Sequence, residues 1–205
     1  MPIWCHDGSA SLGIMAMYLA RVPEADALLD EDPLALVIGM LLDQQIPLEK
    51  AFSGPLVLKE RLGGALDAAE IARYEPEAFA ALCAKPPAIH RFPKSMAARV
   101  QTLCRIVTDE YDGDAAAVWA KAKDGQDVLK RLAALPGFGK QKAQIFLALL
   151  GKQRGVKAKG WREAAGDFGV KGSYKSVADI VDDASLGRVR AYKKDMKAKA
   201  KEAAG

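Results

Sequence analysis

The stretch Val128-Leu-Lys-Arg-Leu-Ala-Ala-Leu-Pro-Gly-Phe-Gly-Lys-Gln-Lys-Ala-Gln-Ile-Phe-Leu-Ala-Leu-Leu150 predicts a helix, a glycine hairpin and a second helix. Apolar residues recur at three- and four-residue spacing on both sides of the hairpin, which is typical of two helices that bury one face each. These apolar positions are Val128, Leu129, Leu132, Leu135, Ile145, Phe146 and Leu149. We therefore predict a helix–hairpin–helix over residues 128–150.

The hairpin at residues 135–139 has the composition of a phosphate-binding turn. Gly137 and Gly139 permit positive φ and let the backbone approach another surface closely. The second helix begins directly after the hairpin, so its unpaired N–H groups and its dipole favour an anion at that end. A hairpin that only packs two helices together is the alternative. The residues that we expect at the phosphate are Leu135, Pro136, Gly137, Phe138, Gly139, Lys140 and Lys142.

The whole chain has 205 residues, of which 50% are hydrophobic and 27% are charged, as in an ordinary globular protein. This length allows one large domain or two small ones that share a core. Helical spacing recurs along the chain, whereas β-branched runs of period two are scarce, so the predicted fold class is all-α.

No apolar run approaches the ~20 residues that are needed to cross a membrane. The first residues, MPIWCHDGSASLG, carry no basic region of the kind that begins a signal peptide. We therefore expect no membrane partner and a cytoplasmic location, with association to the nucleoid when the protein is bound to DNA.

The cysteines are Cys5, Cys83 and Cys104. An odd and widely spaced set indicates neither a disulfide framework nor a metal cluster. We expect reduced thiols, no metal and no cofactor.

Charge is distributed unevenly along the chain, although the net charge is only +4. Residues 187–201 hold seven basic residues against the single acid Asp195, whereas residues 24–32 hold five acids and no basic residue. The basic C-terminal helix either follows a phosphate backbone or is a solvated, partly frayed tail, and the sequence leaves both interpretations open.

Helix signals place the remaining elements. Asp32-Pro33 starts a helix through residues 34–45 that is apolar nearly all round, as a buried helix would be, and Pro47 opens another toward Arg61. Ser95 is predicted to cap a long amphipathic helix. The Pro-rich connector at 85–93 is the predicted lobe boundary. Further helices are expected as two short ones within 67–84, and at 114–123, 127–134, 161–165, from 173 and from 186.

The string LPGFGKQKAQIFLALLGK, from Leu135, resembles the helix–hairpin–helix of the HhH-GPD superfamily of DNA glycosylases, which includes endonuclease III and the 3-methyladenine glycosylases. A second segment, LALVIGMLLDQQI at residues 34–46, resembles the early core helix of that family, which ends in an apolar–Gln–Gln segment beside the DNA. The resemblance covers residues 30–170. It implies a two-lobed α-helical fold that extrudes a damaged base from duplex DNA into the cleft between its lobes.

This resemblance also sets the expected domain limits. Residues 1–30 would complete the helical core, residues 31–170 would form the HhH-GPD domain, and residues 171–205 would form a basic helical extension. We expect a monomer that binds damaged double-stranded DNA.

By resemblance, Gln45 lies where family members insert a side chain into the DNA near the lesion, and its amide would hydrogen-bond the orphaned base. Capping of the preceding helix is the alternative for Gln44 and Gln45. Two other side chains each have two possible roles. Trp161 either stacks on the extruded base or packs in the core, and His90 either lines the cleft or packs.

The sequence departs from the family where catalysis is expected. Monofunctional members keep an Asp after the hairpin helix, which stabilises positive charge on the sugar or activates water. No Asp occurs between Gly155 and Gly166, and Lys157 or Lys159 falls near its place. The lysine of the lyase-type members corresponds to Gln141, and the pattern of four cysteines that holds iron–sulfur in some members is absent. If the protein is active, the resemblance implies hydrolysis without metal or cofactor.

Three alternatives follow for the chemistry. Glu163 replaces the missing Asp on the same short helix, or Asp43 or Asp167 reaches the cleft instead. In the third alternative, catalysis has been lost and the protein is a noncatalytic adaptor that recognises damaged DNA. A purely protein-binding helical domain is a weaker interpretation, and it predicts no salt-dependent affinity for DNA.

Overall fold

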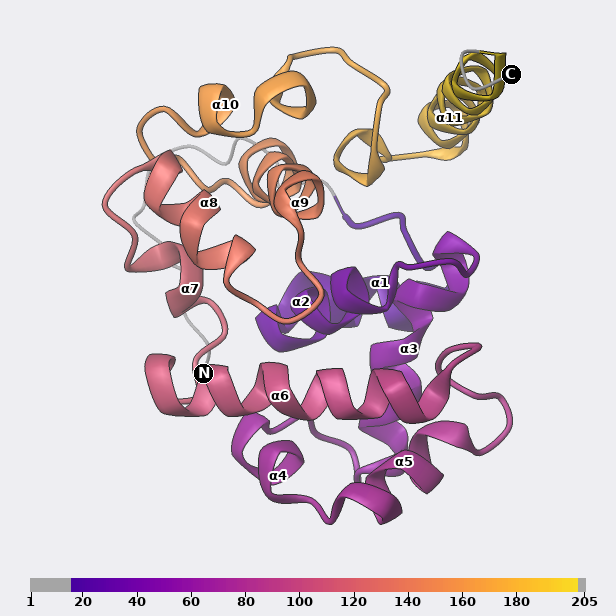
Figure 1. The fold of residues 1–205 in the computed structure, drawn as a ribbon, viewed down its shortest axis with the longest axis vertical. Helices are drawn as coiled ribbons and strands as arrows, with labels where there is room; N and C mark the ends of the chain where they lie inside the picture. Colours follow the sequence, from indigo (N-terminus) through magenta and orange to yellow (C-terminus); the bar gives the residue numbers. More distant parts are fainter. Residues whose placement is uncertain (1–15, 203–205) are drawn as a thin grey trace.

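The computed structural model describes residues 16–202, and every regular element in that range is helical (Figure 1). The all-α prediction is confirmed. The elements are α1 (Pro23–Glu31), α2 (Pro33–Leu42), α3 (Leu48–Arg61), α4 (Ala68–Arg73), α5 (Pro76–Ala84), α6 (Pro93–Tyr111), α7 (Ala117–Ala120), α8 (Gly125–Ala133), α9 (Lys140–Gln153), α10 (Trp161–Ala164), the 3-10 helices η1 (Gly166–Gly169) and η2 (Val177–Asp179), and α11 (Asp183–Glu202).

Helix α2 forms the centre of the core. Every residue from Leu34 to Leu42 is buried, as its nearly uniform apolar sequence predicts. The Asp32 carboxylate begins the helix by accepting hydrogen bonds from the N–H groups of Leu34, at 2.8 Å, and Ala35. The helix ends at Leu42, earlier than predicted, so Gln44 and Gln45 lie in the loop that follows it.

A first lobe contains α3 to α6 with α1 and α2. In Figure 1, α4 and α5 lie on one side of the long helix α6, and α1 and α2 lie on the other. The buried face of α6 includes Met96, Val100, Leu103 and Val107, as its periodicity predicts. The helix begins at Pro93 with Phe92 in the capping position, so the prediction that Ser95 caps it is wrong.

The Pro-rich connector lies inside this lobe, and its prediction as a lobe boundary is wrong. It joins α5 to α6, which pack against each other. The guanidinium of Arg61 holds the connector by donating hydrogen bonds to the carbonyl oxygens of Leu82, Lys85 and Pro87, at 2.7–3.0 Å. Proline breaks the helix there, but the chain turns back onto its own lobe.

A second lobe contains α7 to α10 and η1, with α8 and α9 as the predicted helical hairpin (Figure 1). Trp161 is buried between these helices. A Cβ on Gly151 would lie 2.5 Å from its ring, and one on Gly125 would lie 2.4 Å from its Cα, so both glycines are needed for this close approach.

Three segments differ from their predictions. Helix α1 forms in the acidic stretch, where the Asp26 carboxylate accepts hydrogen bonds from the N–H groups of Leu19, Ala20 and Arg21. Only residues 117–120 of the expected helix at 114–123 are α-helical, and the expected helix after residue 173 is the single 3-10 turn η2. Within residues 16–202, no helix is both long and apolar enough to span a bilayer.

The two cysteines in the described range, Cys83 and Cys104, are buried free thiols. Burial raises the pKa of each to about 12. Cys5 lies outside the described residues.

Candidate nucleic-acid interface

The hairpin between α8 and α9 is anchored by its two large side chains. Leu135 and Phe138 are buried, and the ring of Phe138 lies against that of Phe146 with 5.9 Å between centroids. Gly137 has φ +78°, as predicted, whereas Gly139 has φ −72°. Gly137 thus adopts the positive φ that glycine permits, whereas Gly139 does not. A Cβ on Gly139 would meet no atom within 4 Å, so this residue borders open space.

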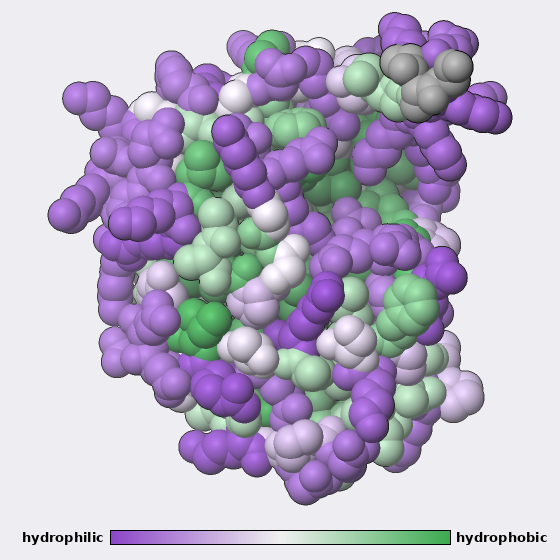
Figure 2. Space-filling view, viewed as in Figure 1, coloured by the Kyte–Doolittle hydropathy of each residue, from purple (hydrophilic) through white to green (hydrophobic). Residues whose placement is uncertain are grey.

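The backbone amides at the start of α9 face solvent. Gly137, Gly139, Lys140 and Gln141 are exposed, and their N–H groups donate to no acceptor among the described residues. The helix ladder begins only with the N–H of Ala143, which donates to the carbonyl oxygen of Gly139. In Figure 2 the surface here forms a pale strip of weakly polar and apolar residues among hydrophilic ones. This end of α9 thus has free donors and the positive end of the helix dipole, which suits a phosphate.

The hairpin docks against the C-terminal end of α2. A Cβ on Gly137 would lie 2.8 Å from the Leu41 side chain and 3.2 Å from the Gln44 amide nitrogen. The Lys142 Nζ donates hydrogen bonds to the carbonyl oxygens of Met40, at 2.7 Å, and Asp43, at 3.0 Å. Met40 lies in the last turn of α2 and Asp43 is its C-terminal capping residue, and helix geometry leaves carbonyl acceptors unpaired at this end.

Lys142 therefore joins the two lobes, in place of the phosphate contact that the sequence predicts. Burial lowers the pKa of this lysine from 10.5 to about 8. Lys140 remains exposed at the start of α9.

The two glutamines after α2 have different surroundings. Gln44 is half-buried and bonded to the protein, since its Nε2 donates to the carbonyl oxygen of Leu41 at 2.7 Å and its Oε1 accepts from Arg99 at 3.1 Å. Gln45 is exposed with φ +57° and makes no side-chain hydrogen bond to a described residue. Left-handed backbone is uncommon outside glycine and concentrates at functional sites. Gln44 thus matches the capping alternative, and Gln45 is the glutamine that the loop presents to solvent.

His90 is hydrogen-bonded to the loop that follows α2. Its Nδ1 accepts a hydrogen bond from the N–H of Phe92 at 3.0 Å, so its Nε2 carries the proton and donates to the carbonyl oxygen of Gln44 at 2.8 Å. Burial lowers the pKa of the ring. Both ring nitrogens are engaged with the protein, so the packing alternative describes His90.

Asp43 is a half-buried acid at the junction between the lobes. Its carboxylate accepts no hydrogen bond from a described residue, and Lys193 of α11 and Lys142 are the cations that act on it. Burial raises the pKa of Asp43 by more than these two lysines lower it. The carboxylate also lies at the C-terminal end of α2, where the helix dipole disfavours negative charge.

The other two candidate carboxylates are more exposed. Glu163 lies on the one-turn helix α10 and makes no ion pair with a described residue. Asp167 lies in η1, with its side chain 84% exposed, and pairs with Lys175 at 3.2 Å. Neither shares a hydrogen bond or an ion pair with Asp43. Of the two alternatives for Trp161, packing describes its position, since its ring packs against Gly151 and lies under Arg162.

Two basic residues at the junction are missing from the sequence prediction. Arg99, on α6, donates a hydrogen bond to Gln44, and the charge of Lys193, on α11, acts to lower the pKa of Asp43. Arg99 looks like any exposed residue of an amphipathic helix. The basic composition of residues 187–201 is the one signal that draws attention to Lys193.

An all-helical molecule whose glycine hairpin opens unpaired amides to solvent has the architecture of a helix–hairpin–helix DNA-binding protein. The family model of the HhH-GPD superfamily base excision DNA repair protein matches residues 38–204, and the chain belongs to this superfamily. Its members bind DNA and act in base excision repair. No curated protein matches the chain.

Proposed function

We propose that this protein is a monofunctional DNA N-glycosylase, which binds damaged duplex DNA across the lobe junction and hydrolyses the bond between base and sugar with Asp43 as the catalytic carboxylate. The observation that carries this proposal is the position of Asp43. It is half-buried without a hydrogen-bond donor, directly before Gln44 and Gln45 and beside the docked hairpin. We also propose that the protein acts as a monomer in the cytoplasm, on DNA of the nucleoid.

Binding is proposed to use two contacts. The amides at the start of α9 and the charge of Lys140 hold a phosphate, which fixes the register of the protein on the duplex. Gln45, exposed on a strained loop, fills the gap that the extruded base leaves. The extruded nucleotide then lies at the junction where Asp43 ends α2.

The proposed reaction is hydrolysis by water. The bond between C1′ and the base nitrogen breaks, and its electron pair leaves with the base, so positive charge develops on the sugar. The Asp43 carboxylate stabilises this charge and takes a proton from the attacking water, whose oxygen bonds to C1′. The departing base takes up a proton from solvent. Only the ionised carboxylate can accept this proton and stabilise the charge. We therefore expect the rate of base release to rise with pH through the raised pKa of Asp43.

Lys142 is proposed as a positioning residue for this acid. Its Nζ donates to the carbonyl oxygen of Asp43 at 3.0 Å, which fixes the backbone of the acid relative to α9. Its charge also favours the ionised carboxylate.

The test is base release from duplexes that each carry one alkylated, deaminated or oxidised base, followed by alkaline cleavage of abasic sites. The parent should release at least one base. Asp43→Asn should reduce release by about 100-fold or more, and the matched variants Glu163→Gln and Asp167→Asn should retain it. Full release by Asp43→Asn, or loss of release in Glu163→Gln, would overturn the assignment of Asp43.

A noncatalytic damage-binding adaptor is the second candidate. One observation favours it, namely that the segment between α9 and α10, where the family places its Asp, instead presents the exposed lysines Lys157 and Lys159. Its signature is tight binding to an abasic duplex, with no base released across the same panel and no effect of Glu163→Gln.

A further inference from the structure

Helix α11 is attached to the body only by its first turns. Ser185, Leu186 and Val189 are buried, whereas Tyr192 is half-buried and every other residue from Arg190 to Glu202 is exposed. Figure 1 shows the helix standing apart from both lobes. Most of its length therefore covers no part of the hydrophobic core.

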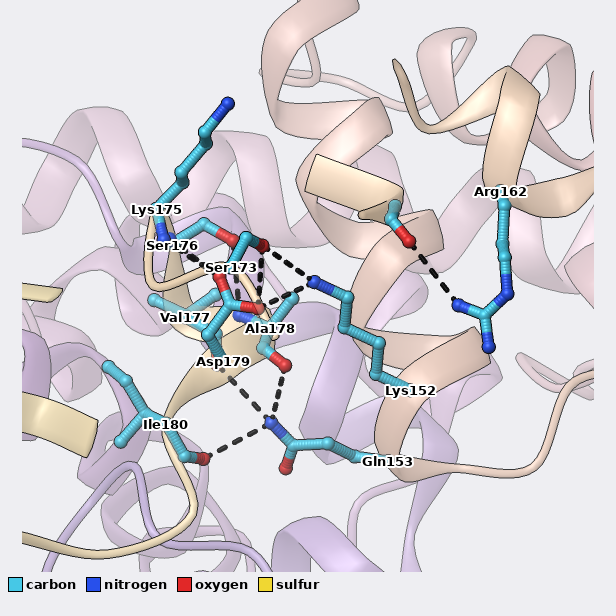
Figure 3. A network of polar contacts seen from close by, with 11 residues as sticks. Lys152, Gln153, Arg162, Ser173, Lys175, Ser176, Val177, Ala178, Asp179 and Ile180 are labelled. Carbon is cyan, nitrogen blue, oxygen red and sulfur yellow. Dashed lines mark hydrogen bonds and ion pairs between the residues drawn. The ribbon is translucent and has the colours of Figure 1, made fainter. Parts of the chain in front are cut away.

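The segment before α11 is held firmly, as Figure 3 shows. The Asp179 carboxylate accepts hydrogen bonds from Lys152 Nζ, at 2.5 Å, from the Ser173 hydroxyl and from the N–H groups of Lys175 and Ser176. The side chain of Asp179 is only 3% exposed, and that of Lys152 only 13%. A buried, multiply bonded ion pair of this kind fixes the geometry of a loop.

Gln153 and Asp182 complete the attachment. The Gln153 Nε2 donates to the carbonyl oxygens of Ala178, at 2.9 Å, and Ile180, at 3.1 Å (Figure 3). The Asp182 carboxylate accepts from the N–H of Ser185 at 2.7 Å, which caps the start of α11. The direction in which α11 leaves the body is thus set by the fold.

That direction takes α11 past the loop between α2 and α3. Arg190 pairs with Glu49 in the first turn of α3, and Arg21 pairs with Asp183 at 3.0 Å. One turn beyond Arg190, Lys193 acts on Asp43. The helix therefore passes the proposed site and continues beyond it.

The exposed part of α11 carries more positive charge than the protein neutralises. Lys199 pairs with Asp195 at 2.9 Å, whereas Lys194, Lys197 and Lys201 have no ion pair with a described residue. Lys193 and Lys197 are four positions apart, as are Lys197 and Lys201, and like charges at this spacing destabilise a helix. An anionic partner would relieve this repulsion.

We propose that α11 binds the phosphate backbone of the duplex that flanks the damaged base, on the side of the α2–α3 loop. This inference rests on the proposed function, since it extends the DNA site that begins at the hairpin and Asp43. Duplex DNA is the occupant because the unpaired lysines recur along one exposed helix and complement a regular row of phosphates. The lysines hold the backbone and do not read bases.

The test compares two triple variants of the full chain with equal loss of charge. Lys194→Gln, Lys197→Gln and Lys201→Gln remove the cations of α11, and Lys85→Gln, Lys121→Gln and Lys123→Gln remove exposed cations elsewhere. The association constant for an abasic-analogue duplex is measured over a range of salt concentrations, and circular dichroism checks the helix content. Each lost phosphate contact lowers the slope of log K against log salt by about 0.9.

The α11 variant should lose about 2 to 3 units of slope, and the control variant less than about 1. A parental slope in the α11 variant, or an equal loss in the control, overturns the inference and leaves the proposed function standing. Absence of any salt-dependent binding by the parent overturns the proposed function itself.

Discussion

At the scale of single residues, Asp43 stands out because its surroundings oppose its charge. It ends α2 at the negative pole of the helix dipole, it is half-buried, and no described N–H donates to its carboxylate. The two lysines that act on it offset this only in part. A charge kept where it lowers stability fits a catalytic carboxylate, since function and stability often conflict at active sites.

Asp43→Asn should therefore stabilise the protein while it reduces base release. The folded pKa of Asp43 is raised above its ordinary value, so the unfolded state loses this proton at lower pH than the folded state. Its contribution to stability falls as pH rises through that interval, and the deficit persists at neutral pH. We expect a gain in the free energy of unfolding at pH 7, measured by urea denaturation, and a smaller gain near pH 4. A variant less stable than the parent at pH 7 would contradict this.

At the scale of elements, the docking of the hairpin on α2 depends on two short contacts. Gly137 lies against Leu41, and Lys142 satisfies the last carbonyl oxygens of α2. The hairpin and the buried helix were predictable, because both follow from local periodicity and turn chemistry. The inward direction of Lys142 was not, because its partners lie about a hundred positions earlier in the chain. For the same reason, the sequence could not show that Gln44 caps the helix while Gln45 is exposed.

Lys142 should give this contact a distinct pH dependence. Its folded pKa is about 8, against the ordinary 10.5. As pH rises from 8 toward 10.5, the folded state has released the proton while the unfolded state still binds it, so the contribution of Lys142 to stability increases. The stability of the parent relative to Lys142→Met should grow by on the order of 1–2 kcal/mol over this range, after allowance for its partial exposure. Denaturation at a series of pH values checks this, and a constant difference would speak against a desolvated lysine.

At the scale of the whole molecule, the lobes meet where α2 emerges from the core. The helix is buried up to Leu42, and the loop after it is bonded by side chains from other elements, namely Arg99 from α6, His90 from the connector and Lys142 from α9. The charge of Lys193, from α11, also acts on the pKa of Asp43. These residues are far apart in sequence. The sequence alone therefore predicts the segments that hold them, but not which side chains meet at the junction. The hairpin amides, Gln45 and α11 are the parts that it leaves open to a duplex.

The most direct test of the central claim is an NMR titration of the amide groups with a duplex that contains an abasic analogue. We predict that the amide signals of Gly139, Lys140 and Gln141 shift and become protected from exchange, together with that of Gln45. The exposed Gly63 and Gly64, in the turn after α3, serve as controls and should not change. If the protein is saturated with DNA while the amides at the start of α9 keep their free-state shifts and exchange rates, these groups do not bind the phosphate and the account is contradicted.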